Sequence, residues 1–315
     1  MKKKPIAIVA LGGNALIRAG EQGTIAQQFA NTRRSLDGII YLLRKGYQVA
    51  VTHGNGPQAG NEMIRMERSA EVIPTHPLGV IDASTQGWIG YMISQSLYNR
   101  LLQEKLDHRV TAVITQVIVD PNDPSIQDPS KPVGPFYKQD QVEELTKKGW
   151  VVKADAGRGY RRVVASPKPK KIVEKDAILA LLGMDQVVVT VGGGGIPVYL
   201  EEDEKLEGLD AVIDKDRASA VLGVELNAEL LLILTGIEKV MINYKQPNEK
   251  PIDRMDVNQA LLYLKQGEFA PGSMQPKIEA AVEFIQKGGK KVIITELDKA
   301  IQALQGKTGT VISDE

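Results

Sequence analysis

The stretch Ile6-Ala7-Ile8-Val9-Ala10-Leu11-Gly12-Gly13-Asn14 decides the fold of this chain. The residues before the glycines are all apolar, which is typical of a strand buried on both faces of a parallel sheet. The paired glycines that follow allow backbone N–H groups to approach a ligand closely, because neither carries a Cβ. Alone, such a pair is more often a plain turn between a strand and a helix.

The same arrangement occurs a second time, where the strand 47–52 runs into His53-Gly54-Asn55-Gly56-Pro57. Ligands of open α/β sheets bind outside the carboxyl ends of the strands. We therefore expect the two glycine loops to face one pocket.

Composition narrows the chemistry that the chain can use. The 315 residues contain 39 Lys and Arg against 39 Asp and Glu, so net charge gives no argument for a nucleic acid or a membrane surface. There is no cysteine, and the three histidines show no metal-ligand spacing. The chemistry must therefore depend on Lys, Asp, Asn and the backbone, and local clusters must hold any anion.

No segment suggests a membrane or an export signal. The longest apolar run, 230–234, is far too short to span a bilayer, and the first residues lead directly into a strand. A cytoplasmic protein is the expectation.

Hydrophobic spacing predicts an alternation of strands and helices. We expect a helix over 24–46, opened by a capping box at Thr24, a long helix over 81–101 and a third strand over 110–119. Parallel pairing with right-handed crossovers is the expected topology.

The sequence changes character at Asp120. Prolines at 121, 124, 129, 132 and 135 interrupt regular structure, and a short polar helix over 139–148 and strand-like runs over 151–164 follow. We interpret 120–167 as a protruding lobe that could act as a lid.

A second α/β layer is predicted after the lobe. A helix up to 183 is expected first, followed by strands at 186–191, 230–234, 240–244 and 291–295. Helices are expected to be opened by 212–216 and run through 222, to span 256–265 and to start within 271–277, with a final helix and strand. The run Gly192-Gly193-Gly194-Gly195 follows a buried strand, which suits close approach to a phosphate but is also compatible with a simple loop.

Two nucleotide motifs are incomplete. Gly54 to Ala59 fits GxGxxG/A, yet no acidic residue follows at the ribose position, which disfavours a dinucleotide fold. Gly306-Lys307-Thr308 lacks the earlier glycine of a P-loop, which excludes a Walker ATPase.

Three lysines lie where a phosphate clamp would need them. Lys131 lies among prolines, Lys215 opens a helix between Asp214 and Asp216, and Lys277 lies in the first turn of another helix. A lysine at a helix start opposes the macrodipole, which favours a bound anion there. The alternative is that each is a solvated surface charge. The segment 157–162 likewise has a plain interpretation as a basic turn.

Together these residues resemble the carbamate kinase branch of the amino acid kinase family, along essentially the whole chain. The segments that carry the resemblance are Ala10-Leu11-Gly12-Gly13-Asn14-Ala15, His53-Gly54-Asn55-Gly56-Pro57-Gln58, Ser84-Thr85-Gln86-Gly87, Gly90-Tyr91, Lys131-Pro132-Val133-Gly134-Pro135-Phe136, Asp155-Ala156-Gly157-Arg158-Gly159, Gly192-Gly193-Gly194-Gly195-Ile196-Pro197, Val212-Ile213-Asp214-Lys215-Asp216 and Pro271-Gly272-Ser273-Met274-Gln275-Pro276-Lys277. Most kinases of the wider family carry a lysine two residues before the first glycine pair. This chain has Ala10 there and a lysine in the lobe instead, which speaks against acetylglutamate, glutamate and uridylate kinases.

The resemblance implies an α/β fold, a three-layer αβα sandwich with a mostly parallel central sheet and a protruding lobe. It implies a single amino acid kinase domain over 1–315, with a carbamate and carbamoyl phosphate half over about 1–190 and a nucleotide half over about 191–315. It also implies a homodimer that converts carbamate and ATP reversibly to carbamoyl phosphate and ADP, with Mg²⁺.

The resemblance also assigns roles to residues. Gly12, Gly13, Asn14, Gly54, Asn55 and Gly194 are expected to hold the carbamoyl end and the phosphoryl group. The catalytic set is Lys131, Lys215, Asp216 and Lys277. Nucleotide contacts are expected from Lys215, Thr235, Gly236, Tyr244, Met274 and Lys277, and Asp214 is the candidate for Mg²⁺.

Two other functions stay open at this point. The same fold could serve as a non-catalytic sensor of a nucleotide or an acyl phosphate. It could also phosphorylate another small carboxylate, since the arginines within 157–162 could bind a second carboxylate.

Overall fold

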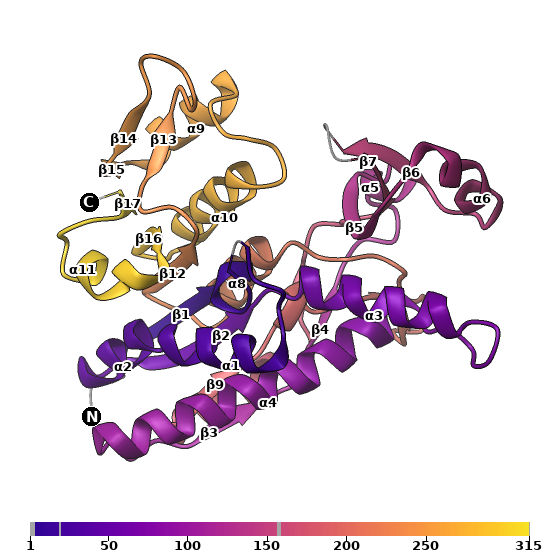
Figure 1. Cartoon of the computed structure of the whole chain (residues 1–315). Helices are drawn as coiled ribbons and strands as arrows, with labels where there is room; N and C mark the ends of the chain where they lie inside the picture. The colour runs from indigo at the N-terminus through magenta and orange to yellow at the C-terminus, as the bar shows by residue number, and fades with distance from the viewer. Residues whose placement is uncertain (1–3, 19, 156–158, 315) are drawn as a thin grey trace.

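The central sheet of the computed structural model, which describes residues 4–18, 20–155 and 159–314, has eight strands (Figure 1). Their order across the sheet is β15 (Arg254–Met255), β17 (Thr310–Ile312), β16 (Lys291–Glu296), β12 (Leu230–Thr235), β1 (Ile6–Leu11), β2 (Gln48–His53), β9 (Val187–Val189) and β3 (Val110–Ala112). Neighbouring strands run parallel except β16 and β17, which are antiparallel. The predicted strand 6–11 therefore lies in the middle of the sheet.

Strand β1 supplies residues to two separate cores. Ile6, Ile8 and Ala10 lie in one buried cluster, while Ala7 and its alternate neighbours lie in another. Because side chains alternate across a strand, both faces of the sheet are covered. This confirms the predicted αβα sandwich.

Two sets of helices cover the faces. On the face of Ile8 lie α7 (Lys175–Gly183), α8 (Lys215–Glu225), α9 (Val257–Gln266) and α10 (Met274–Gln286). On the opposite face lie α1 (Ile25–Arg34), α2 (Asp37–Arg44), α4 (Leu78–Glu104) and α11 (Ala300–Leu304).

The predicted single helix over 24–46 was wrong, because the chain forms α1 and α2 instead. The capping box at Thr24 is present and opens α1 as predicted. At the junction the Ser35 hydroxyl donates to the carbonyl oxygen of Thr32 at 2.7 Å. Such local bonds from a serine compete with the helical ladder and end it.

The predicted strand over 110–119 was also wrong. It divides into β3 and β4 (Gln116–Ile118), which belong to different sheets. Between them the side chain of Gln86 accepts from the backbone N–H of Thr115 at 2.7 Å and donates to its carbonyl oxygen at 3.1 Å. Thr115 is thus held by α4, and its carbonyl oxygen also accepts from the backbone N–H of Ile196 at 2.9 Å, so the chain passes from the central sheet to the sheet of β4 there.

Helix α3 (Gly56–Ser69) was not predicted, although Pro57 lies in its first turn, where a proline is favourable.

Two small sheets were not predicted as such. One contains β11 (Leu206–Gly208), β10 (Ile196–Leu200), β4 and β8 (Lys171–Ile172), and the other is the hairpin of β13 (Val240–Ile242) and β14 (Lys250–Ile252).

A three-stranded antiparallel sheet stands out from the body at the upper right of Figure 1. It contains β5 (Lys131–Tyr137), β7 (Gly159–Val164) and β6 (Val152–Asp155), with α5 (Pro124–Gln127) and α6 (Val142–Lys147) beside it. Of the predicted basic turn 157–162, residues 157 and 158 lie outside the described residues, and 159–162 belong to β7.

Glycines allow this lobe to approach α3 closely. A Cβ on Gly60 would lie 3.4 Å from the Cα of Gly134, and the Tyr137 hydroxyl donates to Glu67 at 3.0 Å.

Across the described ranges, no helix has the length and apolar character needed to cross a membrane.

Candidate active site

The candidate site is built at the carboxyl ends of β1, β2 and β12, which are neighbours in the sheet. The backbone N–H of Gly12 donates to the carbonyl oxygen of Leu234 at 2.8 Å, and a Cβ on Gly12 would lie 2.7 Å from the same oxygen. A Cβ on Gly54 would lie 3.8 Å from the side chain of Lys215 and 3.9 Å from the amide nitrogen of Gly13. The structure thus brings both predicted glycine loops together beside Lys215. The side chain of Asn14 lies outside what the structure describes.

Two of the predicted lysines share one buried carboxylate. Asp216, which is 3% exposed, accepts from the ammonium groups of Lys215 at 2.5 Å and Lys277 at 3.0 Å, one at each oxygen. Burial by itself raises the pKa of the Asp216 carboxyl, but the two ammonium groups outweigh it and hold the pKa below its usual value. Asp216 therefore stays ionised and fixes both cations.

The third lysine reaches the same region from the lobe. Lys131, on β5, donates to Asp214 at 3.0 Å. The other oxygen of Asp214 accepts from the backbone N–H groups of Asp216 and Arg217, so Asp214 is the N-cap of α8. One carboxylate thus links the lobe to the helix that carries Lys215.

The glycine run 192–195, which follows β9, has a strained backbone conformation and packs against the segment before α8. Val191 has a φ of 50°, which is uncommon for a β-branched residue, and Gly193 and Gly194 have φ of 68° and 101°. A Cβ on Gly194 would lie 2.3 Å from the carbonyl oxygen of Ile213, in the segment just before α8. Only glycine fits between β9 and α8 at this position.

Sequence reasoning gave no role to the residues that hold Asn55. Its amide nitrogen donates to Asp82 at 2.8 Å and to Thr85 at 2.9 Å, both on α4 and both buried. Burial raises the pKa of Asp82 to about 7. The sequence does contain a pattern that indicates a buried polar site on this helix. Asp82, Thr85 and Gln86 are polar residues at helical spacing on an otherwise apolar stripe.

His53, at the end of β2, is fully enclosed. Burial lowers its pKa to about 4, so the ring is neutral at physiological pH. A Cβ on Gly192 would lie 2.5 Å from its Nε2, which places the ring against the glycine run.

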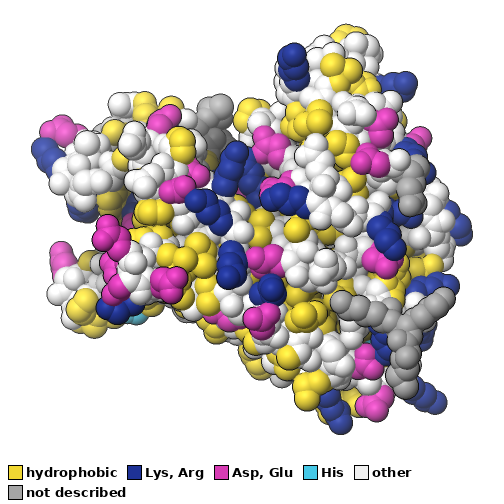
Figure 2. Space-filling model, turned by 180° about the vertical axis from the view of Figure 1, so that it is seen from behind, with side chains coloured by type: hydrophobic (Ala, Val, Ile, Leu, Met, Phe, Trp, Pro, Cys, Tyr) yellow, Lys and Arg dark blue, Asp and Glu magenta, His cyan; other side chains and the backbone are white. Residues whose placement is uncertain are grey.

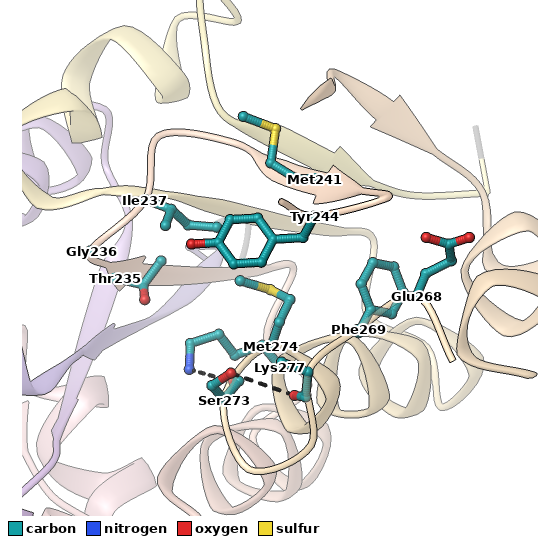
Figure 3. A pocket seen from close by; sticks show the side chains of 11 residues that line it. Thr235, Gly236, Ile237, Met241, Tyr244, Glu268, Phe269, Ser273, Met274 and Lys277 are labelled. Atoms are coloured by element: carbon teal, nitrogen blue, oxygen red, sulfur yellow. Dashed lines mark hydrogen bonds between the residues drawn. The ribbon is translucent and has the colours of Figure 1, made fainter. Parts of the chain in front are cut away.

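A cavity of about 300 Å³ lies beside the lysines, between the end of β12 and the start of α10 (Figure 3). All five residues predicted to bind nucleotide outside α8 border it, together with residues that sequence reasoning missed. The full lining is Thr235, Gly236, Ile237, Met241, Tyr244, Glu268, Phe269, Ala270, Ser273, Met274 and Lys277. Figure 3 shows Tyr244 and Met274 projecting into one space, with Lys277 at its edge and bonded to the Ser273 carbonyl. Lys277 therefore joins this cavity to Asp216.

A larger cleft, of about 920 Å³, separates the lobe from the start of α10. Its lining includes the basic residues Lys131, Arg161, Lys168 and Arg217. The space-filling view shows Lys and Arg side chains gathered near the middle of one face (Figure 2). Although the chain is neutral overall, positive charge is thus concentrated locally, as an anionic ligand requires.

The side chains of the site offer few ligands for Mg²⁺. Among residues 4–18, 20–155 and 159–314, no group of three His, Asp or Glu side chains could hold a metal ion. Asp214 borders the cleft, but Lys131 and the start of α8 use its oxygens. Because Mg²⁺ in kinases takes one or two carboxylates together with substrate phosphates, Asp214 fits only as a partner of a phosphate-bound ion.

The sequence pattern that defines the amino acid kinase family matches residues 5–296 of this chain. The chain belongs to the amino acid kinase family. The resemblance predicted from the motifs is therefore confirmed.

Individual members of the family are similar over nearly the whole chain. The carbamate kinase of Thermococcus kodakarensis is 46% identical over 312 residues, which cover 98% of this chain and 99% of that protein. The carbamate kinase-like protein YqeA of Escherichia coli is 46% identical over 316 residues, covering 99% of each. The solved structure of carbamate kinase from Giardia lamblia bound to AMP-PNP has a TM-score of 0.92 at 41% identity and covers 99% of each chain.

Proposed function

We propose that this amino acid kinase is a carbamate kinase, which transfers a phosphoryl group reversibly between ATP and carbamate and so forms carbamoyl phosphate and ADP. The observation that carries the proposal is the position of Asp216. It joins Lys277, at the edge of a cavity suited to a nucleoside, to Lys215, beside the two glycine loops. A phosphoryl group between the cavity and the loops would lie within reach of both cations.

The side chains agree with the chemistry. Carbamate is already an oxyanion, so its attack on the γ-phosphoryl group needs no general base. The buried His53 is held neutral and in contact with the glycine run, and no base role falls to it. Phosphoryl transfer through a loose transition state needs alignment and charge neutralisation above all.

Each predicted residue has a part in this reaction. Gly12, Gly13, Asn14, Gly54, Asn55 and Gly194 border carbamate and the transferred group. The N–H groups of Gly12, Gly54 and Gly194 already donate to backbone carbonyl oxygens, so those of Gly13, Asn14 and Asn55 hold the ligand. Lys215 and Lys131 neutralise the moving phosphoryl group, Lys277 grips the nucleotide phosphates, and Asp216 orients Lys215 and Lys277.

We assign the nucleotide to the cavity whose lining residues are drawn in Figure 3. Thr235, Gly236, Tyr244 and Met274 contact its adenosine part, and Lys215 and Lys277 contact its phosphates. Asp214 is the side chain that would hold a Mg²⁺ ion bound with the nucleotide, and such an ion would supply further positive charge beside the phosphates.

The test is ATP formation from ADP and carbamoyl phosphate with Mg²⁺, measured beside acetyl phosphate. We expect turnover with a clear preference for carbamoyl phosphate. This comparison is informative because the chain is equally identical to a protein named carbamate kinase and to one named carbamate kinase-like. A preference for acetyl phosphate would favour a kinase of another carboxylate, and nucleotide binding without turnover of either donor would favour a sensor.

We also propose a cytoplasmic homodimer. Tyr91, Tyr98 and Leu102 project from α4 at helical spacing, and they are 57%, 43% and 60% exposed. A row of exposed apolar side chains along one helix is typical of a surface that a partner covers.

A further inference from the structure

The side chain of Asn55 is held in one orientation by α4. Asn55 is only 7% exposed, and its amide nitrogen donates to the Asp82 carboxylate at 2.8 Å and to the Thr85 hydroxyl at 2.9 Å. An amide NH₂ group has two hydrogens, so both are used in these bonds.

The direction of the amide follows from Thr85. Its hydroxyl carries one hydrogen, which it donates to the backbone carbonyl oxygen of Asp82 at 2.9 Å. The hydroxyl oxygen must therefore accept from Asn55, and only the NH₂ end of the amide can supply that bond. The carbonyl end of the Asn55 amide consequently points away from α4.

The carbonyl oxygen of this amide lies among the glycine loops. The whole amide lies against the glycine run, because a Cβ on Gly193 would lie 2.4 Å from its nitrogen and 2.8 Å from its oxygen, and the preceding residue, Gly54, lies against Gly13 and Lys215. In the part of the chain that the structure describes, no group donates a hydrogen bond to this oxygen. An acceptor is thus left open beside the loops.

This arrangement has a cost for the fold. The second carboxylate oxygen of Asp82 is buried and has no partner among the described residues. Burying an unpartnered polar atom is unfavourable. Asp82 is therefore poorly explained by stability alone.

We propose that the Asn55 side-chain oxygen accepts a hydrogen bond from the amino group of carbamate or carbamoyl phosphate, with Asp82 and Thr85 as its positioning residues. The inference rests on the proposed function and deepens it. Acetyl phosphate carries a methyl group where carbamoyl phosphate carries its amino group. With acetyl phosphate the acceptor would face that methyl group unpaired, so the site would reject this donor.

The experiment compares kcat/KM for carbamoyl phosphate and for acetyl phosphate, both with ADP and Mg²⁺. The variants are Thr85→Val, which removes the hydroxyl at nearly equal volume, and Asp82→Asn/Thr85→Val. Ser96→Ala is the matched control, because Ser96 is also buried on α4 and its hydroxyl has no partner among the described residues.

For the wild type we expect kcat/KM to be about 10-fold or more higher for carbamoyl phosphate than for acetyl phosphate. This factor corresponds to the free-energy penalty of leaving one buried acceptor unpaired. Thr85→Val should lower the ratio about fivefold and the double variant about tenfold, mainly through the carbamoyl phosphate value. Ser96→Ala should keep the wild-type ratio.

The outcomes separate the two proposals. Turnover with a ratio in Thr85→Val and the double variant within twofold of the wild type would overturn this inference and leave the proposed function standing. If the wild type turns over neither donor, both the proposed function and this inference are wrong. If the double variant does not fold, Thr85→Val decides alone, and circular dichroism checks its fold.

Discussion

Asp216 is the residue on which two cations of the site converge. It is buried and ionised, and each of its oxygens accepts from one lysine. Removing one cation leaves the other paired, so a lysine variant is expected to test the chemistry more than the fold.

Lys215→Ala is expected to lower kcat by about 10²-fold or more, the scale for loss of one strong transition-state donor. Steady-state ATP formation measures it. Lys205→Ala is the control, since Lys205 is an exposed lysine that pairs with Asp203. A folded Lys215→Ala protein with a near-normal rate would remove the catalytic role of Lys215.

His53 provides a prediction about pH. Its folded pKa of about 4 lies below the ordinary value of 6.5, because the buried ring disfavours charge. The unfolded chain then binds more protons between these values, so the contribution of His53 to stability is complete above pH 6.5 and is lost as the pH falls to about 4. An NMR titration of the imidazole, assigned with His53→Gln, should show no transition near 6.5. A midpoint there would contradict the enclosed ring.

At the scale of elements, sequence reasoning succeeded where a pattern is local. Strands β1, β2 and β12 contain apolar runs at 6–11, 49–51 and 230–234, and the glycines and lysines that follow strands or open helices could be identified by type. The division of 110–119 depends on Gln86, which is distant in sequence. The support of Asn55 by α4 is equally non-local, so a pattern within one segment could not reveal it.

The contact between the glycine run and the start of α8 yields a stability prediction. Gly194→Ala must place a methyl group 2.3 Å from the Ile213 carbonyl oxygen at a φ of 101°. We expect the free energy of unfolding to fall by about 2–4 kcal/mol, the range for a strained backbone with a steric clash.

Chemical denaturation measures this change. Gly208→Ala is the control, because a Cβ there meets nothing within 4 Å and the residue lies in a strand. Its change should stay within about 1 kcal/mol. Equal stability of the two variants would show that the glycine run tolerates a side chain.

At the scale of the whole molecule, the exposed apolar row on α4 predicts the oligomeric state. Leu102→Glu/Tyr98→Lys places charge in that row, and light scattering after size-exclusion chromatography should show a shift from dimer to monomer. Leu262→Glu is the control, because Leu262 is 52% exposed on α9, outside the row. A wild-type monomer would contradict the proposed dimer.

The position of β17 has a consequence for synthesis on the ribosome. This strand lies between β15 and β16, although both are translated before it. Until residues 310–312 have left the exit tunnel, β16 has an open edge and β15 has no neighbour in the central sheet. The half of the molecule that carries Lys277 therefore cannot complete its sheet while translation proceeds through 254–309, and a nascent chain stalled in that interval exposes a strand edge to other chains.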